Sequence, residues 1–326
     1  MIANTSLKEI GEILEKAGSV LFFPHENADA DAIGSCVALC SVMRSRGKKA
    51  YVLTDVPLTE YVAFLDDGEG ERFITTQKNI IYEPDVCICV DCSDVSRIPG
   101  LEGVFASGKV TMVIDHHIAD ECRADYYYID PAEAATAQIV WRLLGEMNCH
   151  IDRTVANALL TALSSDTGNF SYSNTTADTL RIAAELIDIG VDYNKIMVNL
   201  YQRKDIRQLR IEAAAVGNME LLAEGRIAFV SITCEMFKRY DASMEHAEEV
   251  INVIRDIEGV EYAFVLKEAG PDKIRVSMRA KTYGNVGSIA AALGGGGHMK
   301  AAGCTLKCGL DEAVTKVKAE IGMLAL

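Results

Sequence analysis

Short, uninterrupted apolar runs alternate with helical patterns over about the first 130 residues, and this alternation limits the fold more than any other feature. Apolar runs at residues 19–24, 48–53, 85–90 and 109–114 predict strands, and residues 31–47 carry the pattern of an intervening helix. Strands that are apolar along their whole length and are connected through helices are typical of a parallel sheet. The sequence therefore predicts an α/β fold in which helices cover both faces of a parallel sheet.

Helical patterns follow the predicted strands, and the pattern changes again beyond about residue 223. Further helices are predicted at residues 132–147, 153–166 and 176–190, and a charged, glycine-poor segment at 193–223 predicts a connecting helix pair. Strands follow at residues 226–235, 261–270 and 273–281, with a hairpin turn at Gly270-Pro271 and flanking helices at 245–257 and 310–322. We therefore expect a parallel-sheet domain over residues 1–190, a helical connector over 191–224 and a smaller α/β domain over 225–326.

The charge balance restricts the size of any nucleic-acid partner. The net charge of −15 argues against a broad basic surface that would track long DNA or RNA. It does not exclude a small anionic substrate, because bound divalent metal ions can invert the local electric field. We expect no long nucleic acid among the partners.

Several features indicate a cytoplasmic protein with no membrane partner. No apolar run approaches the roughly 20 residues of a membrane helix. The N-terminus lacks a basic region followed by an apolar one, as a secretory signal would have. The 10 cysteines lie in apolar segments and do not resemble a secreted disulfide framework.

Polar clusters stand where four of the apolar segments end. Residues 25–31 follow the first predicted strand, Asp91 follows the third, residues 115–117 follow the fourth, and Asp166 ends a predicted helix. Ligands bind beyond the carboxyl ends of the strands in open parallel sheets. We therefore expect the first three clusters to converge on one edge of the sheet, joined by Asp166.

The residue types in these clusters suit divalent metal ions. Imidazole and carboxylate ligands without cysteine favour Mn²⁺, with Mg²⁺ or Co²⁺ as alternatives, over structural zinc. More than four such ligands suit two ions roughly 3.5–4 Å apart that share a bridging carboxylate. Taken singly, each residue has an ordinary explanation, since Asp31, for example, could be a helix N-cap. The combination favours a two-metal site.

The motifs as a set resemble those of the DHH superfamily of phosphoesterases. HENADADAIGS resembles the first motif, H-x-x-x-D-x-D-x-x-G-S, and VDCSD, IDHH and SSDTGNF resemble the next three. Far downstream, VSMRAK and GGGGHMKAAG resemble the DHH-associated C-terminal domain. The resemblance spans residues 19–305 in the family's order. Ala28 stands where many relatives carry proline, at a position that offers no ligand.

The resemblance implies a role for each matching residue. The metal ligands would be His25, Asp29 and Asp91 for the first ion, and Asp31, Asp91, His116 and Asp166 for the second. Four residues would serve catalysis: His116, His117, Asp115 and Asn27. Of these, His117 and Asn27 would face the scissile phosphate, and Asp115 would orient a metal ligand.

The C-terminal region offers groups that could bind the rest of the substrate. Glycine backbone N–H groups can approach an anion closely, and a strand arginine can bind a phosphate in bidentate fashion. The predicted substrate-binding residues are Ser277, Arg279, Lys281, Gly295, Gly296, Gly297 and His298. The ordinary alternative is a flexible glycine turn beside a solvated arginine. We expect the active site to lie in a cleft between the two domains.

Within the superfamily, the chain resembles the branch of oligoribonucleases (nano-RNases) and phosphoadenosine-phosphate phosphatases. The expected reaction is two-metal hydrolysis of short oligoribonucleotides, linear dinucleotides such as pApA, or 3′-phosphoadenosine 5′-phosphate. The enzymatic alternatives are a cyclic-dinucleotide phosphodiesterase and a family II-like pyrophosphatase or exopolyphosphatase. The alternative outside catalysis is a silent nucleotide-binding sensor. The family's habit also makes a homodimer plausible.

Overall fold

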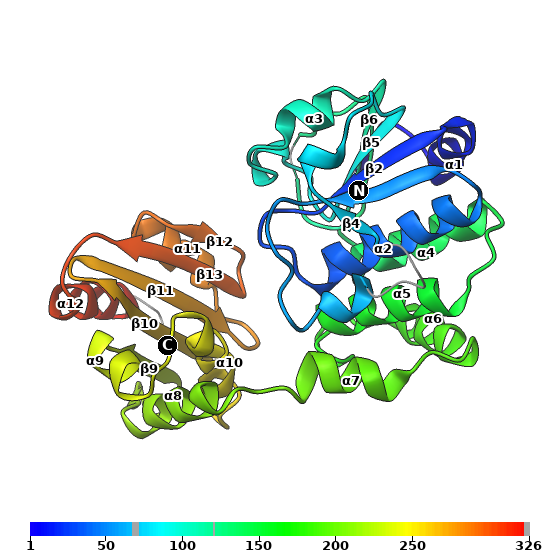
Figure 1. Ribbon diagram of the computed structural model, residues 1–326. Coiled ribbons are helices and arrows are strands. Elements are labelled where there is room, and N and C mark those ends of the chain that lie inside the picture. Colours follow the sequence, from blue (N-terminus) through cyan, green and yellow to red (C-terminus); the bar gives the residue numbers. More distant parts are fainter. Residues whose placement is uncertain (67–71, 120, 323–326) are drawn as a thin grey trace. The chain divides into compact units, whose positions relative to one another are not determined.

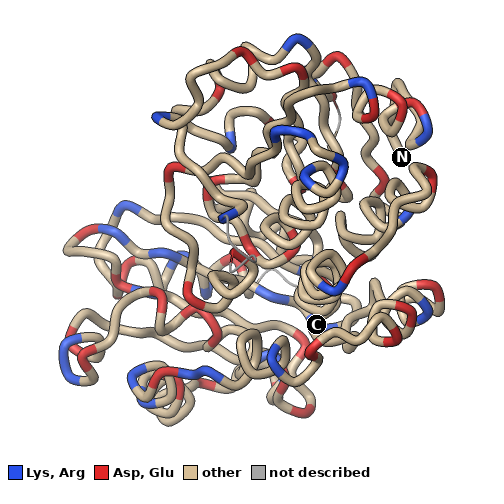
Figure 2. The backbone as a smooth tube through the Cα atoms, turned by 45° about the vertical axis from the view of Figure 1, so that its right-hand side comes forward, with Lys and Arg blue, Asp and Glu red and all other residues tan. Residues whose placement is uncertain are grey.

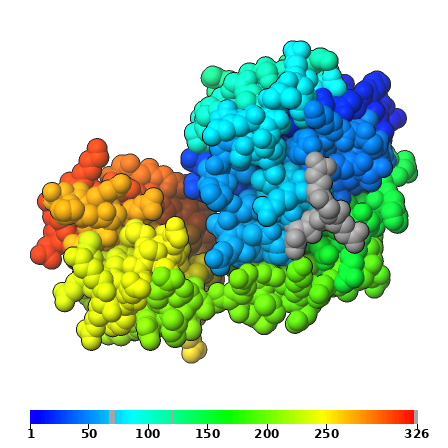
Figure 3. Space-filling view, viewed as in Figure 1, coloured from blue at the N-terminus to red at the C-terminus, as the bar shows by residue number. Residues whose placement is uncertain are grey.

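The computed structural model describes residues 1–66, 72–119 and 121–322. They form two compact units, Met1–Arg203 and Lys204–Leu326, coloured blue to green and yellow-green to red in Figure 3. Each unit has its own sheet and its own hydrophobic core. Within the described residues, every helix is too short or too polar to span a lipid bilayer.

The first unit is built on a seven-stranded sheet. Its strands are β1 (Ile2–Ala3), β2 (Ser19–Phe23), β3 (Lys49–Leu53), β4 (Ile74–Thr75), β5 (Val86–Val90), β6 (Val110–Asp115) and β7 (Tyr126–Ile129). Their order is β1-β7-β6-β5-β2-β3-β4, and every pair is parallel except β1 with β7. The four strands predicted from the apolar runs are thus confirmed as β2, β3, β5 and β6.

Helices cover both faces of this sheet. The helices of this unit are α1 (Leu7–Lys16), α2 (Ala30–Ser45), α3 (Glu102–Ala106), α4 (Thr136–Glu146), α5 (Arg153–Asp166), α6 (Ala177–Asp188) and α7 (Tyr193–Tyr201). Figure 1 shows α2 and α4 on one face and α3 on the other. The larger core lies on the α2 side, where α5 packs behind α2, and a smaller core lies under α3. The strands are therefore buried on both faces, as their uniform hydrophobicity requires.

The second unit has a six-stranded mixed sheet. Its helices are α8 (Ile206–Gly217), α9 (Cys234–Arg239), α10 (Val250–Arg255), α11 (Val286–Ala292) and α12 (Leu310–Ile321). Its strands are β8 (Glu220–Leu222), β9 (Ile227–Ile232), β10 (Tyr262–Gly270), β11 (Lys273–Ala280), β12 (Gly296–Gly297) and β13 (Ala301–Leu306), in the order β12-β13-β11-β10-β9-β8. Only β9 and β10 pair in parallel, and the predicted hairpin joins β10 to β11. One core lies under α11 and α12, and another under α8 and α10.

Two predicted helices differ from the observed ones. The helix predicted at residues 132–147 begins only at Thr136, and the helix predicted at 245–257 is a short 3₁₀ turn followed by α10. The N-cap of α4 is Ala135, which offers no capping side chain. The first N–H groups of α4 donate instead to the carboxylate of Asp31, which is more than 100 residues away in the sequence.

Charged residues of both signs are interspersed along the backbone of each unit (Figure 2). Neither unit carries charges of one sign alone, so only the local geometry distinguishes the predicted metal ligands from the other acidic residues.

Candidate metal centre

The ends of three adjacent strands bring the predicted clusters together. In the sheet order β6-β5-β2, Asp115 is the last residue of β6, Asp91 directly follows β5, and His25 lies just beyond β2. The register pairs Val90 with Ile114, and the Asp91 backbone N–H donates to the Ile114 carbonyl (2.9 Å). Because the strands are parallel, all three carboxyl ends lie at one edge of the sheet, as expected.

Helices α2 and α5 add the remaining carboxylates. Asp29 is the N-cap of α2, and its Oδ1 accepts hydrogen bonds from the N–H groups of Asp31 (3.0 Å) and Ala32 (3.1 Å). Asp31 is therefore not the cap but a fully buried residue of the first helical turn. Asp166 is the last residue of α5, which packs along α2.

The six predicted ligands fall into two groups of three. His25, Asp29 and Asp91 form one group, and Asp31, His116 and Asp166 form the other. Within each group the candidate ligand atoms lie within 4.8 Å of one another. The family resemblance implies the same two sets with Asp91 shared between them, an assignment that sequence spacing alone could not make.

Asp91 lies between the two groups. Its Oδ2 is 3.8 Å from His25 Nε2 in the first group, and its Oδ1 is 3.7 Å from His116 Nε2 in the second. His116 Nε2 is also 3.1 Å from Asp166 Oδ2 and 3.9 Å from Asp31 Oδ2. Each oxygen of Asp91 thus faces a different group, which is the arrangement that a bridging carboxylate needs.

Buried polar atoms at this centre lack hydrogen-bond partners among the described residues. They are His25 Nδ1, Asp91 Oδ2, Asp115 Oδ2 and His116 Nε2. A buried polar atom without a partner costs about 1–3 kcal/mol. Two of these atoms, Asp91 Oδ2 and His116 Nε2, belong to candidate ligands and point at other candidate ligands, so a cation would satisfy both. The residues present therefore fit divalent metal ions.

Burial and mutual repulsion both disfavour the ionised form of the carboxylates at this centre. Burial raises the pKa of Asp91 to about 6, and the charge of Asp29 contributes to the shift. Burial, together with the charges of Asp91 and Asp166, raises the pKa of Asp31 well above its usual range. Such a cluster is unfavourable in its ionised form unless a cation compensates it.

The two adjacent histidines are held in different ways. His116 Nδ1 lies 3.3 Å from the Glu133 carbonyl oxygen, so the tautomer that donates there leaves Nε2 as the ligand atom. His117 Nδ1 lies 2.8 Å from Asp115 Oδ1, which also accepts the His117 backbone N–H (3.0 Å). Asp115 therefore orients His117 directly. With Asp91 and His116, His117 also forms a third possible ligand group.

The backbone at Asp91 adopts a left-handed conformation. Its φ of 61° lies in the left-handed region, which residues other than glycine, asparagine and aspartate seldom adopt. Strained residues persist where the surrounding structure imposes them, and they cluster at functional sites. This conformation immediately follows β5, where it places the Asp91 carboxylate between the two groups.

The sequence motifs point to Asn27 but give no signal for Thr136. Asn27 is exposed between His25 and Asp29, and its predicted role remains a prediction. Thr136 was not identified from sequence. It is fully buried, and its hydroxyl donates to Asp91 Oδ1 (2.8 Å). A threonine inside an apolar helical pattern gives no signal of such a contact.

The predicted substrate-binding residues of the second unit lie on β11 and around β12. Ser277 and Arg279 alternate with the buried residues Val276 and Met278, so they share the face of β11 that is turned away from α11 and α12. Lys281 follows the end of β11, and its ammonium group donates to the Ile257 carbonyl (2.8 Å).

The glycine run is packed rather than loose. A Cβ atom on Gly295 would lie 2.2 Å from the Gly303 carbonyl oxygen, and one on Gly297 would lie 2.5 Å from Ala302 Cα. Gly296 has open space on its Cβ side, and His298 is exposed. Close packing against β13 thus explains two of these glycines, while Gly296 and His298 remain accessible to a ligand.

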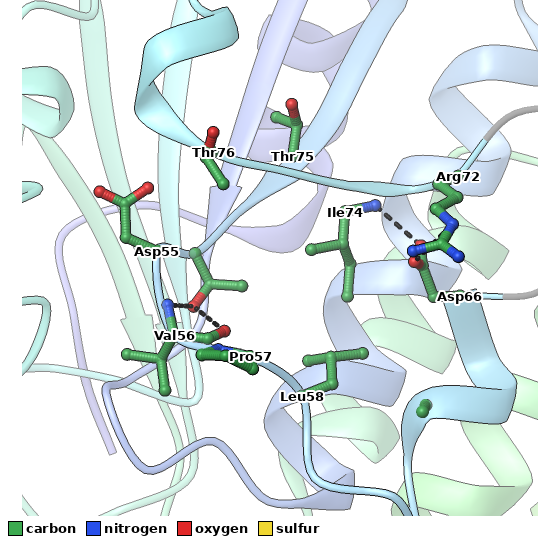
Figure 4. A pocket seen from close by; sticks show the side chains of 11 residues that line it. Asp55, Val56, Pro57, Leu58, Asp66, Arg72, Ile74, Thr75 and Thr76 are labelled. Atoms are coloured by element: carbon green, nitrogen blue, oxygen red, sulfur yellow. Dashed lines mark hydrogen bonds and ion pairs between the residues drawn. The ribbon is translucent and has the colours of Figure 1, made fainter.

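A cavity of about 500 Å³ in the first unit lies apart from these residues (Figure 4). Its lining includes residues 54–58 and 74–76 with Asp66 and Arg72, and none of the predicted site residues. Its carboxylates have partners: Asp55 accepts from Gln77, and Asp66 accepts the Ile74 N–H (2.9 Å). It adds no group to the metal centre.

Comparisons with known proteins agree with this arrangement. The DHH family N-terminal domain matches residues 19–163, and the DHHA1 domain matches residues 226–323. The bifunctional oligoribonuclease and PAP phosphatase NrnA of Thermus thermophilus is 30% identical over 95% of this chain and 92% of its own length. The protein of the same name from Bacillus subtilis is 24% identical over 88% of this chain and 89% of its own length.

A solved structure also has the same fold. The exopolyphosphatase-related protein from Bacteroides fragilis superimposes with a TM-score of 0.88 at 25% identity, covering 97% of this chain and 95% of that one. The family resemblance of the motifs is therefore confirmed along nearly the whole chain. This protein belongs to the DHH family, carries its DHH and DHHA1 domains in order, and groups with the bifunctional oligoribonuclease and PAP phosphatase relatives.

Proposed function

We propose that this protein is a two-metal phosphoesterase that hydrolyses short oligoribonucleotides, linear dinucleotides of the pApA type and 3′-phosphoadenosine 5′-phosphate. The observation that carries the proposal is the pair of histidine–carboxylate groups with Asp91 between them. The relatives named as oligoribonucleases and PAP phosphatases support this substrate range.

The first ion would bind His25, Asp29 and Asp91, and the second would bind Asp31, Asp91, His116 and Asp166. When bound, two divalent ions activate a water molecule for attack and neutralise charge on the phosphate oxygens. Nitrogen and carboxylate ligands without cysteine favour Mn²⁺, with Mg²⁺ or Co²⁺ as alternatives. Cys89 and Cys92 lie close to Asp91 in the sequence but belong to neither ligand group.

The remaining residues of the centre would act on the substrate. The Nδ1 atom of His117 is occupied by Asp115, so Nε2 is the nitrogen left to donate to an oxygen of the scissile phosphate. The imidazole of His117 is 40% exposed, whereas that of His116 is 13% exposed. His117 is therefore the histidine that a substrate can reach, and Asn27 lies on an exposed segment between His25 and Asp29.

In the second unit, Ser277, Arg279 and Lys281 with Gly295, Gly296, Gly297 and His298 would bind the part of the substrate away from the scissile bond. The accessible backbone at Gly296 and the exposed His298 support this role. A site of this kind holds the terminal phosphate or base, and it would favour short molecules over long RNA.

A substrate panel tests the proposal. Metal-stripped protein is incubated with and without Mn²⁺ and with RNAs of two to five units, an RNA of 24 units, 3′-phosphoadenosine 5′-phosphate, pApA, cyclic di-AMP and pyrophosphate. We expect cleavage that depends on Mn²⁺ and is concentrated on the shortest nucleotides.

Other outcomes of the panel would redirect the assignment. Cleavage of cyclic di-AMP alone would make the protein a cyclic-dinucleotide phosphodiesterase. Cleavage of pyrophosphate alone would keep the metal centre but reject the role of the second unit. Tight nucleotide binding without turnover would indicate a silent sensor.

A further inference from the structure

Thr136 connects the two groups of candidate ligands. It is the first residue of α4 and is fully buried. Its backbone N–H donates to Asp31 Oδ2 (2.7 Å), and its hydroxyl donates to Asp91 Oδ1 (2.8 Å). One residue thus contacts a carboxylate of the second group and the carboxylate that lies between the groups.

The backbone contacts fix Asp31. Its Oδ2 accepts from Thr136, and its Oδ1 accepts from the Ala137 N–H (3.0 Å) and the Ser35 hydroxyl (3.1 Å). The free N–H groups at the start of a helix favour a negative charge, so the start of α4 is a suitable partner for the Asp31 carboxylate. The same contact caps α4 in place of the missing local cap.

The hydroxyl contact fixes Asp91. Oδ1 of Asp91 faces His116, whereas Oδ2 faces His25. Thr136 donates to Oδ1, so rotation of the carboxylate about its Cβ–Cγ bond would break a charge-assisted hydrogen bond. Without that hydroxyl, the plane of the carboxylate would no longer be held with one oxygen toward each group.

We propose that Thr136 is a positioning residue that sets the orientation of the Asp91 carboxylate so that it can bridge two metal ions. This inference rests on the proposed two-metal function and adds a specific requirement to it. The Thr136 hydroxyl does not serve as the cap of α4, because the N-cap position is Ala135. Its contact with Asp91 therefore needs another explanation. Residues that orient metal ligands in this way typically change metal affinity by about 10–100-fold when they are removed.

The test compares three variants of the full-length protein. Thr136→Val removes the hydroxyl at nearly constant volume, and Thr136→Ser restores it. Thr161→Val is the matched control, because Thr161 is equally buried but its hydroxyl donates only to the Asn157 carbonyl of its own helix (2.7 Å). Titration calorimetry of metal-stripped protein with Mn²⁺ gives the number of ions and their affinities. Electron paramagnetic resonance reports the magnetic coupling of two bridged Mn²⁺ ions.

We expect Thr136→Val to weaken the binding of at least one ion by about tenfold or more and to lose the signal of coupled ions. Thr136→Ser and Thr161→Val should both retain two coupled ions. If Thr136→Val does not fold, Thr136→Ala takes its place in the same comparison.

Two results would overturn the inference in distinguishable ways. Wild-type affinities and coupling in Thr136→Val, or a failure of serine to restore them, would reject the role of Thr136 and leave the proposed function intact. A wild-type protein that binds fewer than two ions would reject the two-metal function itself, and the bridging role with it.

Discussion

Gly34 of α2 lies so close to Ala158 of α5 that a Cβ atom on Gly34 would be 2.5 Å from the Ala158 carbonyl oxygen and 2.9 Å from Ala162 Cβ. This contact lets the two helices pack closely along their length. Because α2 begins near Asp31 and α5 ends at Asp166, close packing places these two carboxylates in one ligand group.

Gly34→Ala should therefore separate the helices and disturb the second ligand group. The obstructing atom is a backbone oxygen that cannot rotate away, so we expect a loss of about 1–3 kcal/mol in the free energy of unfolding. Mn²⁺ affinity should fall as well. Chemical denaturation and calorimetry measure the two effects. Gly145→Ala in α4 is the control, because a Cβ atom there meets nothing within 4 Å. Unchanged stability and metal affinity in Gly34→Ala would contradict the explanation.

Asp91→Asn should abolish most of the activity while leaving the fold intact. Asparagine tolerates the positive φ of this position and can still accept the hydrogen bond from Thr136. It removes the negative charge that would be shared by the ions, so turnover should fall by at least about a hundredfold. Turnover is measured on pApA with saturating Mn²⁺. Near wild-type activity would disprove the bridging role.

The metal-free form of Asp91→Asn should also resist heat better than metal-free wild type at pH 7.5. Burial raises the pKa of Asp91 to about 6, so ionisation of this carboxyl destabilises the folded metal-free protein above that pH. The advantage of the variant should shrink as the pH falls below 6 and the wild-type carboxyl becomes protonated. Thermal unfolding at pH 5.5 and 7.5 checks the sign, and an advantage that is larger at pH 5.5 would be inconsistent with it.

Arg279→Ala should raise KM for nucleotides by about tenfold, the effect of losing one charge-assisted hydrogen bond to phosphate. Hydrolysis of a minimal aryl phosphate ester should be spared, because that substrate does not extend beyond the metal centre. Arg275→Ala is the matched control, as Arg275 is exposed four residues away on the same face of β11. An unchanged KM for nucleotides would remove Arg279 from the substrate-binding site.

Asp85→Asn should destabilise the first unit at neutral pH. The Asp85 carboxylate accepts from the N–H groups of Gly18 (2.9 Å) and Ser19 (3.0 Å) and pairs with Lys109 Nζ (2.8 Å). These contacts, led by the hydrogen bond from Lys109, lower its pKa to about 2. We expect a loss of about 1 kcal/mol, because the group is partly screened by solvent.

The pH dependence of that loss follows from the sign of the shift. A lowered pKa in the folded state contributes stability above the unfolded value of 3.8, and this stability disappears as the pH falls toward 2. The difference between wild type and Asp85→Asn should therefore be full at pH 7 and shrink between pH 4 and 2. Urea denaturation across this range measures it. A difference that stays constant from pH 7 down to pH 2 would contradict this explanation.

Local patterns were sufficient to predict much of the first unit. The helix predicted at residues 153–166 is α5, and the apolar runs became β2, β3, β5 and β6, because hydrophobic periodicity is a local property of the chain. In the second unit, β13 was not predicted. Its sequence AAGCTL is small and weakly β-forming, and it becomes a strand through its pairing with β11.

The sequence by itself determined the α/β class, the two domain types and the identity of the candidate ligands, since each depends on residue type and on order along the chain. The division of the ligands between two ions was implied by the family resemblance of the motifs, and only the tertiary structure decided which oxygen of Asp91 faces each group and where α4 begins. These features depend on contacts between residues far apart in sequence. Asp31 caps α4 across 105 residues, and Gly34 brings α2 against α5. Contacts of this kind arise from packing and leave no periodic trace in the chain.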